Sequence, residues 1–163
     1  MFKGNKFTSE RGTFKEEIHS ALYRSSDIKE ILLGDTSGMS AAAVQKEFKK
    51  HVISHLHVDE TVLKTDAYIF YDIIFPSLHT NTKSCKVLMY VLSHVDILDN
   101  YYNDNYAGNR ADILTQLIEN ALVNDNDVVN NFGIGQLTLD SEEIYEASHF
   151  YGIVLTFSVA DFR

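Results

Sequence analysis

The feature that most constrains the fold of this 163-residue chain is its last third, where a helical apolar pattern is followed by two alternating patterns. A helix is predicted from Asn109 to about residue 124, because apolar residues recur there at the 3.6-residue period: Ile113, Leu114, Leu117, Ile118, Ala121 and Leu122. Asn109 is a suitable N-cap, and the carboxylate of Asp112 can reach back to its backbone N–H. Residues 135–140 and 150–159 alternate apolar and polar side chains, which predicts antiparallel strands packed on this helix.

Three helices are predicted ahead of the first strand. Thr13 and Glu16 match a T-x-x-E capping box before a first helix. Residues 25–27 offer start signals for a second, short helix, and Gly34 stands where a left-handed cap ends such a run. Residues 41–56 contain good helix formers with a thin apolar stripe, and they predict a third helix.

Two further strands precede the long helix. Residues 67–75 are dense in Tyr, Ile and Phe and end at the only proline, Pro76. Residues 84–95 are apolar on both sides, which is typical of a central strand covered on both faces. Residues 99–108 are rich in Asp, Asn and Tyr and predict a loop. The expected class is α+β, with N-terminal helices and then a mostly antiparallel sheet of about four strands in the order β-β-α-β-β.

Length and composition favour one domain over residues 1–163, since 45% of the residues are hydrophobic and a second core would be hard to fit. Residues 1–12 lack periodicity and are expected to form a flexible arm. Residues 35–65 are expected to be a helical or loop insertion. The N-terminal segment has no apolar core of signal-peptide length, and no stretch approaches the roughly 20 apolar residues of a membrane span. We therefore expect synthesis in the cytoplasm and no membrane partner.

The charge of the chain argues against binding to free duplex DNA. The formal net charge is −9, which disfavours nonspecific contact with phosphates. Lys46, Lys49 and Lys50 form only a local basic face. Cys85 is the lone cysteine, so an intramolecular disulfide cannot form, and its apolar surroundings predict a buried thiol.

Four residues form the only metal-like cluster, namely His51, His55, His57 and Asp59. Spacing i, i+4 would place His51 and His55 on one helical turn, as zinc ligands require. The catalytic glutamate of zincins does not stand between them. Surface histidines at a helix end, where they favour the dipole, are the preferred interpretation.

Other candidate constellations do not predict catalysis or cofactor binding. His94 and His149 could meet across the sheet as a structural pair. Gly133-Ile134-Gly135 lacks the third glycine of a dinucleotide site and follows a loop. Glu142 and Glu143 lie in a predicted hairpin loop, where carboxylates are usually solvated. No nucleophile elbow occurs. We expect no enzyme activity, no cofactor and no metal.

Several short motifs resemble the neck and tail-completion proteins of tailed bacteriophages, of the tail-terminator or head–tail joining type. The motifs are Ile28-Lys29-Glu30-Ile31-Leu32-Leu33-Gly34, Ile74-Phe75-Pro76, Ser93-His94-Val95-Asp96, Gly108-Asn109-Arg110-Ala111-Asp112-Ile113, Gly133-Ile134-Gly135-Gln136-Leu137 and Tyr151-Gly152-Ile153-Val154-Leu155-Thr156-Phe157-Ser158-Val159-Ala160-Asp161-Phe162. The resemblance covers most of residues 25–163.

This resemblance implies a structural virion protein at the head–tail junction, made in the bacterial cytoplasm. It implies a ring, commonly a hexamer, that caps the tail tube and leaves a channel for DNA. The implied partners are other copies of the chain, neighbouring neck or connector proteins and the tail-tube protein, with DNA only as transient cargo. An acidic chain suits such a channel, because it repels phosphate.

Three segments are suited to contact neighbouring subunits: residues 101–106, the predicted hairpin loop 142–149, and the arm before Thr13. Tyrosine offers a large contact area with a polar tip. The candidate interface residues are Tyr101, Tyr102, Tyr106, Glu142, Glu143 and Tyr145. The alternative is that these segments are ordinary mobile loops.

Two other functions stay open on the sequence. A small acidic inhibitor or immunity-type protein would share the single domain and the absence of catalytic motifs, and it would bind a basic partner as a monomer. A histidine-rich metal hydrolase is the third possibility, and metal analysis of the purified protein would test it.

Overall fold

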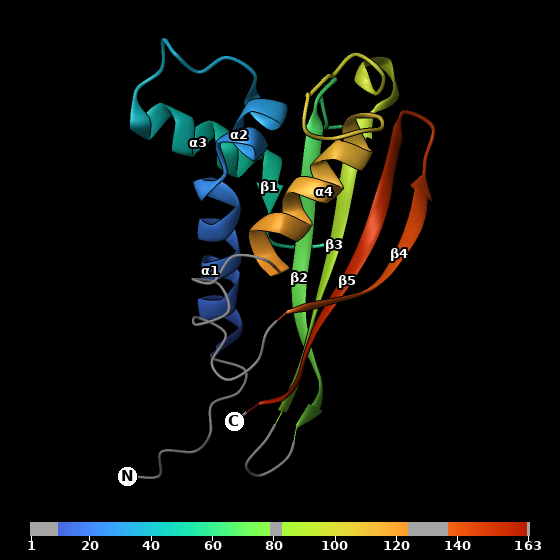
Figure 1. Cartoon of the computed structure of the whole chain (residues 1–163). Helices are drawn as coiled ribbons and strands as arrows, with labels where there is room; N and C mark the ends of the chain where they lie inside the picture. The colour runs from blue at the N-terminus through green and yellow to red at the C-terminus, as the bar shows by residue number, and fades with distance from the viewer. Residues whose placement is uncertain (1–9, 79–82, 124–136, 163) are drawn as a thin grey trace.

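The α+β class is confirmed by the computed structural model, which describes residues 10–78, 83–123 and 137–162 (Figure 1). The described ranges contain the following elements: α1 Glu10–Arg24, α2 Ser26–Leu33, α3 Ala41–His51, β1 Val52–Ile53, β2 Ala67–Leu78, β3 Lys83–His94, a 3-10 helix Val95–Ile97, α4 Arg110–Val123, β4 Thr138–Glu146 and β5 Phe150–Phe162. No helix within these ranges is both long and apolar enough to cross a membrane.

The sheet has five strands in the order β1-β2-β3-β5-β4. Only β1 and β2 are parallel, and the other neighbouring strands are antiparallel. The predicted β-β-α-β-β order is therefore confirmed for β2 to β5. The short β1 is an addition, in a segment where a helix was predicted as far as residue 56. Val52 and Ile53 are β-branched and pair with Ile69 and Phe70 instead of continuing α3.

Helices cover one face of the sheet, and α4 crosses in front of β2 and β3 in Figure 1. The sheet residues buried beneath them include Ile69, Tyr71, Val87, Met89, Leu155 and Phe157. Five of the six residues of the stripe predicted for α4 are buried, and Ala121 is half-buried. This burial of apolar surface supplies most of the driving force for folding.

The opposite face of the sheet is covered at one end by residues 53–63. Four buried sheet residues, Tyr68, Phe70, Leu92 and Phe150, form a second apolar cluster. Ile53, Leu56, Val58 and Leu63 pack against it. The prediction of a central strand covered on both faces is thus confirmed for β3, which carries Val91 in one cluster and Leu92 in the other.

The starts of the first two helices differ in how well local signals predicted them. α1 begins at Glu10, so Thr13 lies inside the helix, and the prediction that it caps the helix is wrong. This helix also overlaps the end of the predicted arm, of which residues 1–9 lie outside the described ranges. For α2, the Ser25 side chain accepts a hydrogen bond from the Ile28 N–H at 3.2 Å, and Gly34 ends the helix with a φ of 73°.

The long helix begins as predicted. The backbone N–H of Asn109 donates to the Asp112 carboxylate at 3.0 Å, and the Asp112 N–H donates to the Asn109 side-chain oxygen at 2.9 Å. The reciprocal pair is a capping box. Gly108 precedes it with a φ of 112°, and a Cβ at this position would lie 2.6 Å from the Asp112 Cβ, so the box requires glycine there.

Two strand boundaries were predicted wrongly. β2 does not end at Pro76, because a register shift between Ile74 and Ser77 lets the strand pass the proline. The hairpin loop predicted for residues 142–149 is also wrong, since β4 extends to Glu146 and pairs with β5 along this length. The outer strand of a sheet carries polar, charged residues that resemble a loop in sequence.

Replacing Gly152 with alanine is expected to destabilise the fold by about 3 kcal/mol. Gly152 is buried in β5 opposite Leu92 of β3, and an added Cβ would overlap the Val91 carbonyl oxygen and lie 2.7 Å from Leu92 Cδ2. Urea denaturation, followed by circular dichroism, measures the change in free energy of unfolding.

The matched control is Gly12→Ala in α1, where nothing lies within 4 Å of the added Cβ. This substitution should be neutral or stabilise by up to about 1 kcal/mol, since alanine favours helix. Equal unfolding midpoints for the two variants would contradict the close approach of β5 to β3.

Candidate functional site

The predicted histidine cluster is not brought together as a metal site. α3 ends at His51, so His51 and His55 do not share a helical turn. His51 is buried rather than on the surface as predicted: its Nδ1 lies 2.9 Å from the Ala67 carbonyl oxygen, and its ring stacks on Tyr68 at 5.0 Å. His55 is exposed and accepts a hydrogen bond from the His57 N–H. The described ranges contain no group of three metal-ligating side chains.

The predicted meeting of His94 and His149 across the sheet is confirmed. Their rings are nearly parallel, at 7°, with centroids 6.0 Å apart. His94 also accepts a hydrogen bond from the Asp96 N–H at 3.1 Å and contacts the edge of Phe150. The pair lies where β3 ends and β5 begins, so the two rings pack at that end of the sheet.

The three candidate tyrosines of the loop at residues 101–106 have different surroundings. Tyr101 is half-buried beneath the Arg110 guanidinium, 5.0 Å from its ring. The Tyr106 hydroxyl accepts a hydrogen bond from the Asn120 amide at 2.9 Å. Tyr102 alone projects from the loop, with 82% of its surface exposed. The loop is therefore fastened at two of the three positions.

The candidates in residues 142–145 belong to the edge strand β4. Glu142 and Glu143 are exposed, and Tyr145 is half-buried and stacks on Tyr90 with centroids 5.8 Å apart. Ile144 was missed by the sequence reasoning. It is 63% exposed, and its position between acidic residues was the signal available in the sequence.

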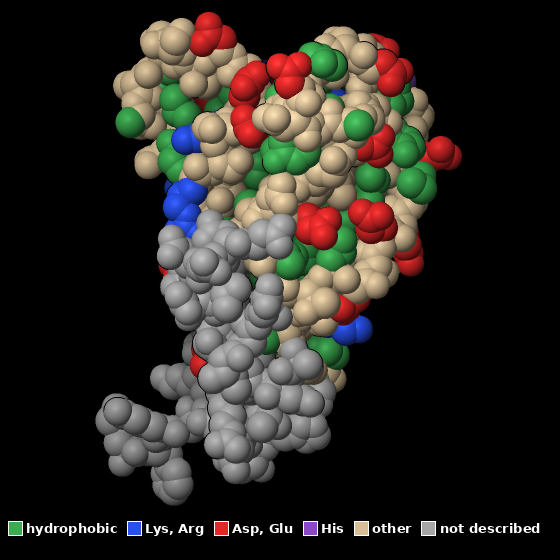
Figure 2. Space-filling model, viewed as in Figure 1, with side chains coloured by type: hydrophobic (Ala, Val, Ile, Leu, Met, Phe, Trp, Pro, Cys, Tyr) green, Lys and Arg blue, Asp and Glu red, His purple; other side chains and the backbone are tan. Residues whose placement is uncertain are grey.

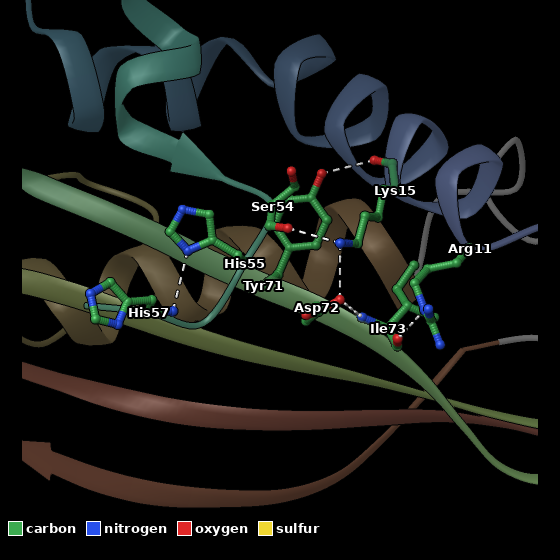
Figure 3. Close-up of polar contacts among 8 residues, drawn as sticks. All are labelled: Arg11, Lys15, Ser54, His55, His57, Tyr71, Asp72 and Ile73. Atoms are coloured by element: carbon green, nitrogen blue, oxygen red, sulfur yellow. Dashed lines mark hydrogen bonds and ion pairs between the residues drawn. The ribbon is translucent and has the colours of Figure 1, made fainter. Parts of the chain in front are cut away.

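A groove at the opposite edge of the sheet was also missed. It has a volume of about 560 Å³ and lies between α1, the end of α3, β1 and β2 (Figure 3). Lys15, Lys49, His19 and His55 lie at its rim together with one acidic residue, Glu16, and Val52 and Tyr71 contribute apolar surface. The helices and strands that contribute these residues are far apart in the sequence, so no local motif predicts the groove.

Lys15 and Tyr71 fix the wall of this groove. The Tyr71 hydroxyl donates to the Lys15 carbonyl oxygen at 2.8 Å. The Lys15 ammonium donates to the Ser54 carbonyl oxygen at 2.9 Å and pairs with the Asp72 carboxylate at 3.0 Å (Figure 3). Burial raises the pKa of Tyr71, so its hydroxyl stays protonated and able to donate.

Charge is distributed unevenly between the two parts of the chain. Residues 1–86 carry 12 Lys or Arg and 11 Asp or Glu, whereas residues 87–163 carry two Lys or Arg and 12 Asp or Glu. In Figure 2, most Lys and Arg side chains lie on the left side, where α1 and α3 are found, and Asp and Glu are spread over the rest of the visible face. The groove therefore lies in the part of the chain where basic and acidic residues nearly balance, whereas the rest of the chain is strongly acidic.

Replacing Lys49 with methionine is expected to raise the pKa of His19. The pKa of His19 lies below its ordinary value of 6.5, first because of burial and second because of the Lys49 charge. Removing the charge should raise the pKa, yet leave it below 6.5, because burial persists. Proton NMR titration of the imidazole signals measures the shift.

The lowered pKa of His19 makes the stability of the fold depend on pH. Because the unfolded chain binds the proton more tightly than the folded chain, the contribution of His19 to the free energy of unfolding is fully present above pH 6.5. It is lost as the pH falls through the lowered pKa of the folded state. Lys46→Met, which makes the same charge change in α3, is the control and should leave His19 unchanged. An unaltered His19 pKa in the Lys49 variant would show that the two side chains do not interact.

Comparison with known protein families shows to which family the chain belongs. The YomW family model matches residues 16–159, which include all the described strands except the end of β5. No curated protein matches the chain. The name of this family is one given to proteins of Bacillus prophages, and it indicates a phage-associated protein. The chain belongs to the YomW family.

Proposed function

We propose that the protein is a structural virion protein of a tailed phage, located at the head–tail junction. Copies of the chain form a ring, a hexamer in the commonest arrangement, which caps the tail tube or joins tail to head. The ring leaves a channel through which DNA passes. The proposal assigns no catalysis, cofactor or metal to the chain. Phage origin of the family supports this assignment.

The observation that carries the proposal is the placement of unlike surfaces at opposite edges of one sheet. The basic groove lies beside β1, and the acidic strand β4 is at the other end of the order β1-β2-β3-β5-β4. A ring of identical subunits needs two different, complementary surfaces on each copy, joined head to tail. A chain with opposite charge at its two edges meets that requirement.

The acidic part of the chain also suits a channel for DNA. Asp96, Asp99 and Asp104 are exposed on the segment between β3 and α4. Carboxylates along a channel repel phosphates and so prevent DNA from binding during passage. DNA is then transient cargo, and the stable partners are the neighbouring copies, the neck or connector proteins and the tail-tube protein.

One observation favours a second function. The exposed carboxylates of β4, including Glu142 and Glu143, would also suit a small intracellular inhibitor that binds a basic partner. Such a protein is a monomer until its partner arrives, whereas a ring subunit associates with itself or with the particle. Self-association and particle content separate the two functions.

Cryo-electron microscopy of phage particles and tails from the same source tests the proposal. The expected result is ring density that fits this fold at the junction of head and tail, with the symmetry read directly from the map. Antibody labelling of the same particles identifies the density independently. Absence of the protein from every particle, together with a monomeric state in solution, would overturn the proposal in favour of the inhibitor.

A further inference from the structure

The face of β4 that carries Ile144 has the form of a docking ligand. Glu142, Ile144 and Glu146 alternate along the strand, so they lie on one face, with two carboxylates flanking one aliphatic side chain. All three are exposed. Because β4 is the last strand in the sheet order, this face lies beside an edge that another molecule can approach without unfolding any described element.

The groove beside β1 has the complementary form. Val52 and Tyr71 give it apolar surface that is already largely removed from water, which suits an aliphatic side chain. Lys49 of α3 and His55, which follows β1, are exposed at its rim, before and after Val52 in the sequence. A carboxylate held near these groups gains a charge-assisted contact at the border of the interface.

We propose that Ile144 of one copy occupies the basic groove of the next copy, with Glu142 and Glu146 placed toward Lys49 and His55. The occupant is thus a second copy of this chain, and the contact repeats head to tail. The inference rests on the proposed function, since it names the two surfaces through which a ring would close.

Charge decides between this contact and the simplest alternative, which is pairing of β4 with β4 of another copy. A symmetric β4 pair would bring acidic residues against one another, and like charges on paired strands are destabilising. The groove has Lys49 and His55 beside apolar surface, and it lies at the far edge of the same sheet. Each copy therefore presents two complementary surfaces, the Ile144 face of β4 and the groove beside β1.

Charge reversal tests the contact. Lys49→Glu and Glu142→Lys should each weaken self-association of the purified full-length protein by at least about tenfold, measured by sedimentation over a range of concentrations. The double variant Lys49→Glu/Glu142→Lys restores opposite charges in every contact and should recover most of the loss. Circular dichroism checks that each variant is folded.

Matched controls lie beside each position. Lys46→Glu makes the same change on α3 outside the groove, and Glu143→Lys makes the same change on the other face of β4. Both should associate like the original protein. Equal effects of the control and test variants, or a protein that stays monomeric up to about 1 mM, would overturn the inference.

Disulfide cross-linking distinguishes a head-to-tail contact, which repeats from copy to copy, from a symmetric contact, which stops at a dimer. A Lys49→Cys/Glu142→Cys variant, which keeps Ile144, should give a ladder of disulfide-linked multimers on oxidation, whereas either single variant should give no more than dimers. Cys85 is fully buried and does not enter the reaction. A double variant that stops at dimers would overturn head-to-tail docking.

The outcomes also separate this inference from the proposed function. Density at the head–tail junction combined with charge variants that associate normally rejects the docking contact and leaves the virion assignment standing. Self-association that responds to charge, in a protein absent from every particle, rejects the virion assignment and supports the contact.

Discussion

The fold depends on how one edge of the sheet is covered where its outermost strand stops. β1 pairs with only Ile69 and Phe70 of β2, so the next part of β2 has no strand beside it on that side. α1 takes the place of the missing strand: Arg11 donates to the Ile73 carbonyl oxygen at 2.9 Å, and Lys15 pairs with Asp72. Leaving such backbone groups unsatisfied in a partly buried edge costs free energy, so these contacts hold α1 against the sheet.

The groove is a consequence of that solution. A helix cannot follow a strand edge as closely as another strand does, because its backbone must stand off by the length of its side chains. α1 approaches β2 through Lys15 and Tyr71, and the space left beyond them, toward β1 and the end of α3, is the groove. The residues that repair the edge are long and polar or basic. The same requirement therefore produces the hollow, and Lys49 and His55 at its rim come from α3 and the segment after β1.

What the sequence could predict depends on whether the deciding interactions are local. The stripe of α4, its Asn109–Asp112 cap and the alternation of β5 are set by neighbours in the chain, and all were found. The end of β4 was taken for a loop, because pairing with β5, rather than its own composition, makes it a strand. The buried position of His51 depends on docking against Tyr68. The groove joins elements far apart in sequence, although the charge difference between residues 1–86 and 87–163 could have been read directly.

The acidic edge strand and the basic groove can be understood as one device. An open edge strand can pair with any other exposed strand, and the acidic residues along β4 suppress this by making pairing with another acidic strand unfavourable. The same charges leave one kind of surface favourable, a hollow with positive groups around apolar walls. Ile144 adds an aliphatic side chain that gains free energy only where water is excluded. Protection from aggregation and selection of a head-to-tail neighbour are then two effects of a single pattern, in which charge rejects the wrong contact and one apolar side chain stabilises the right one.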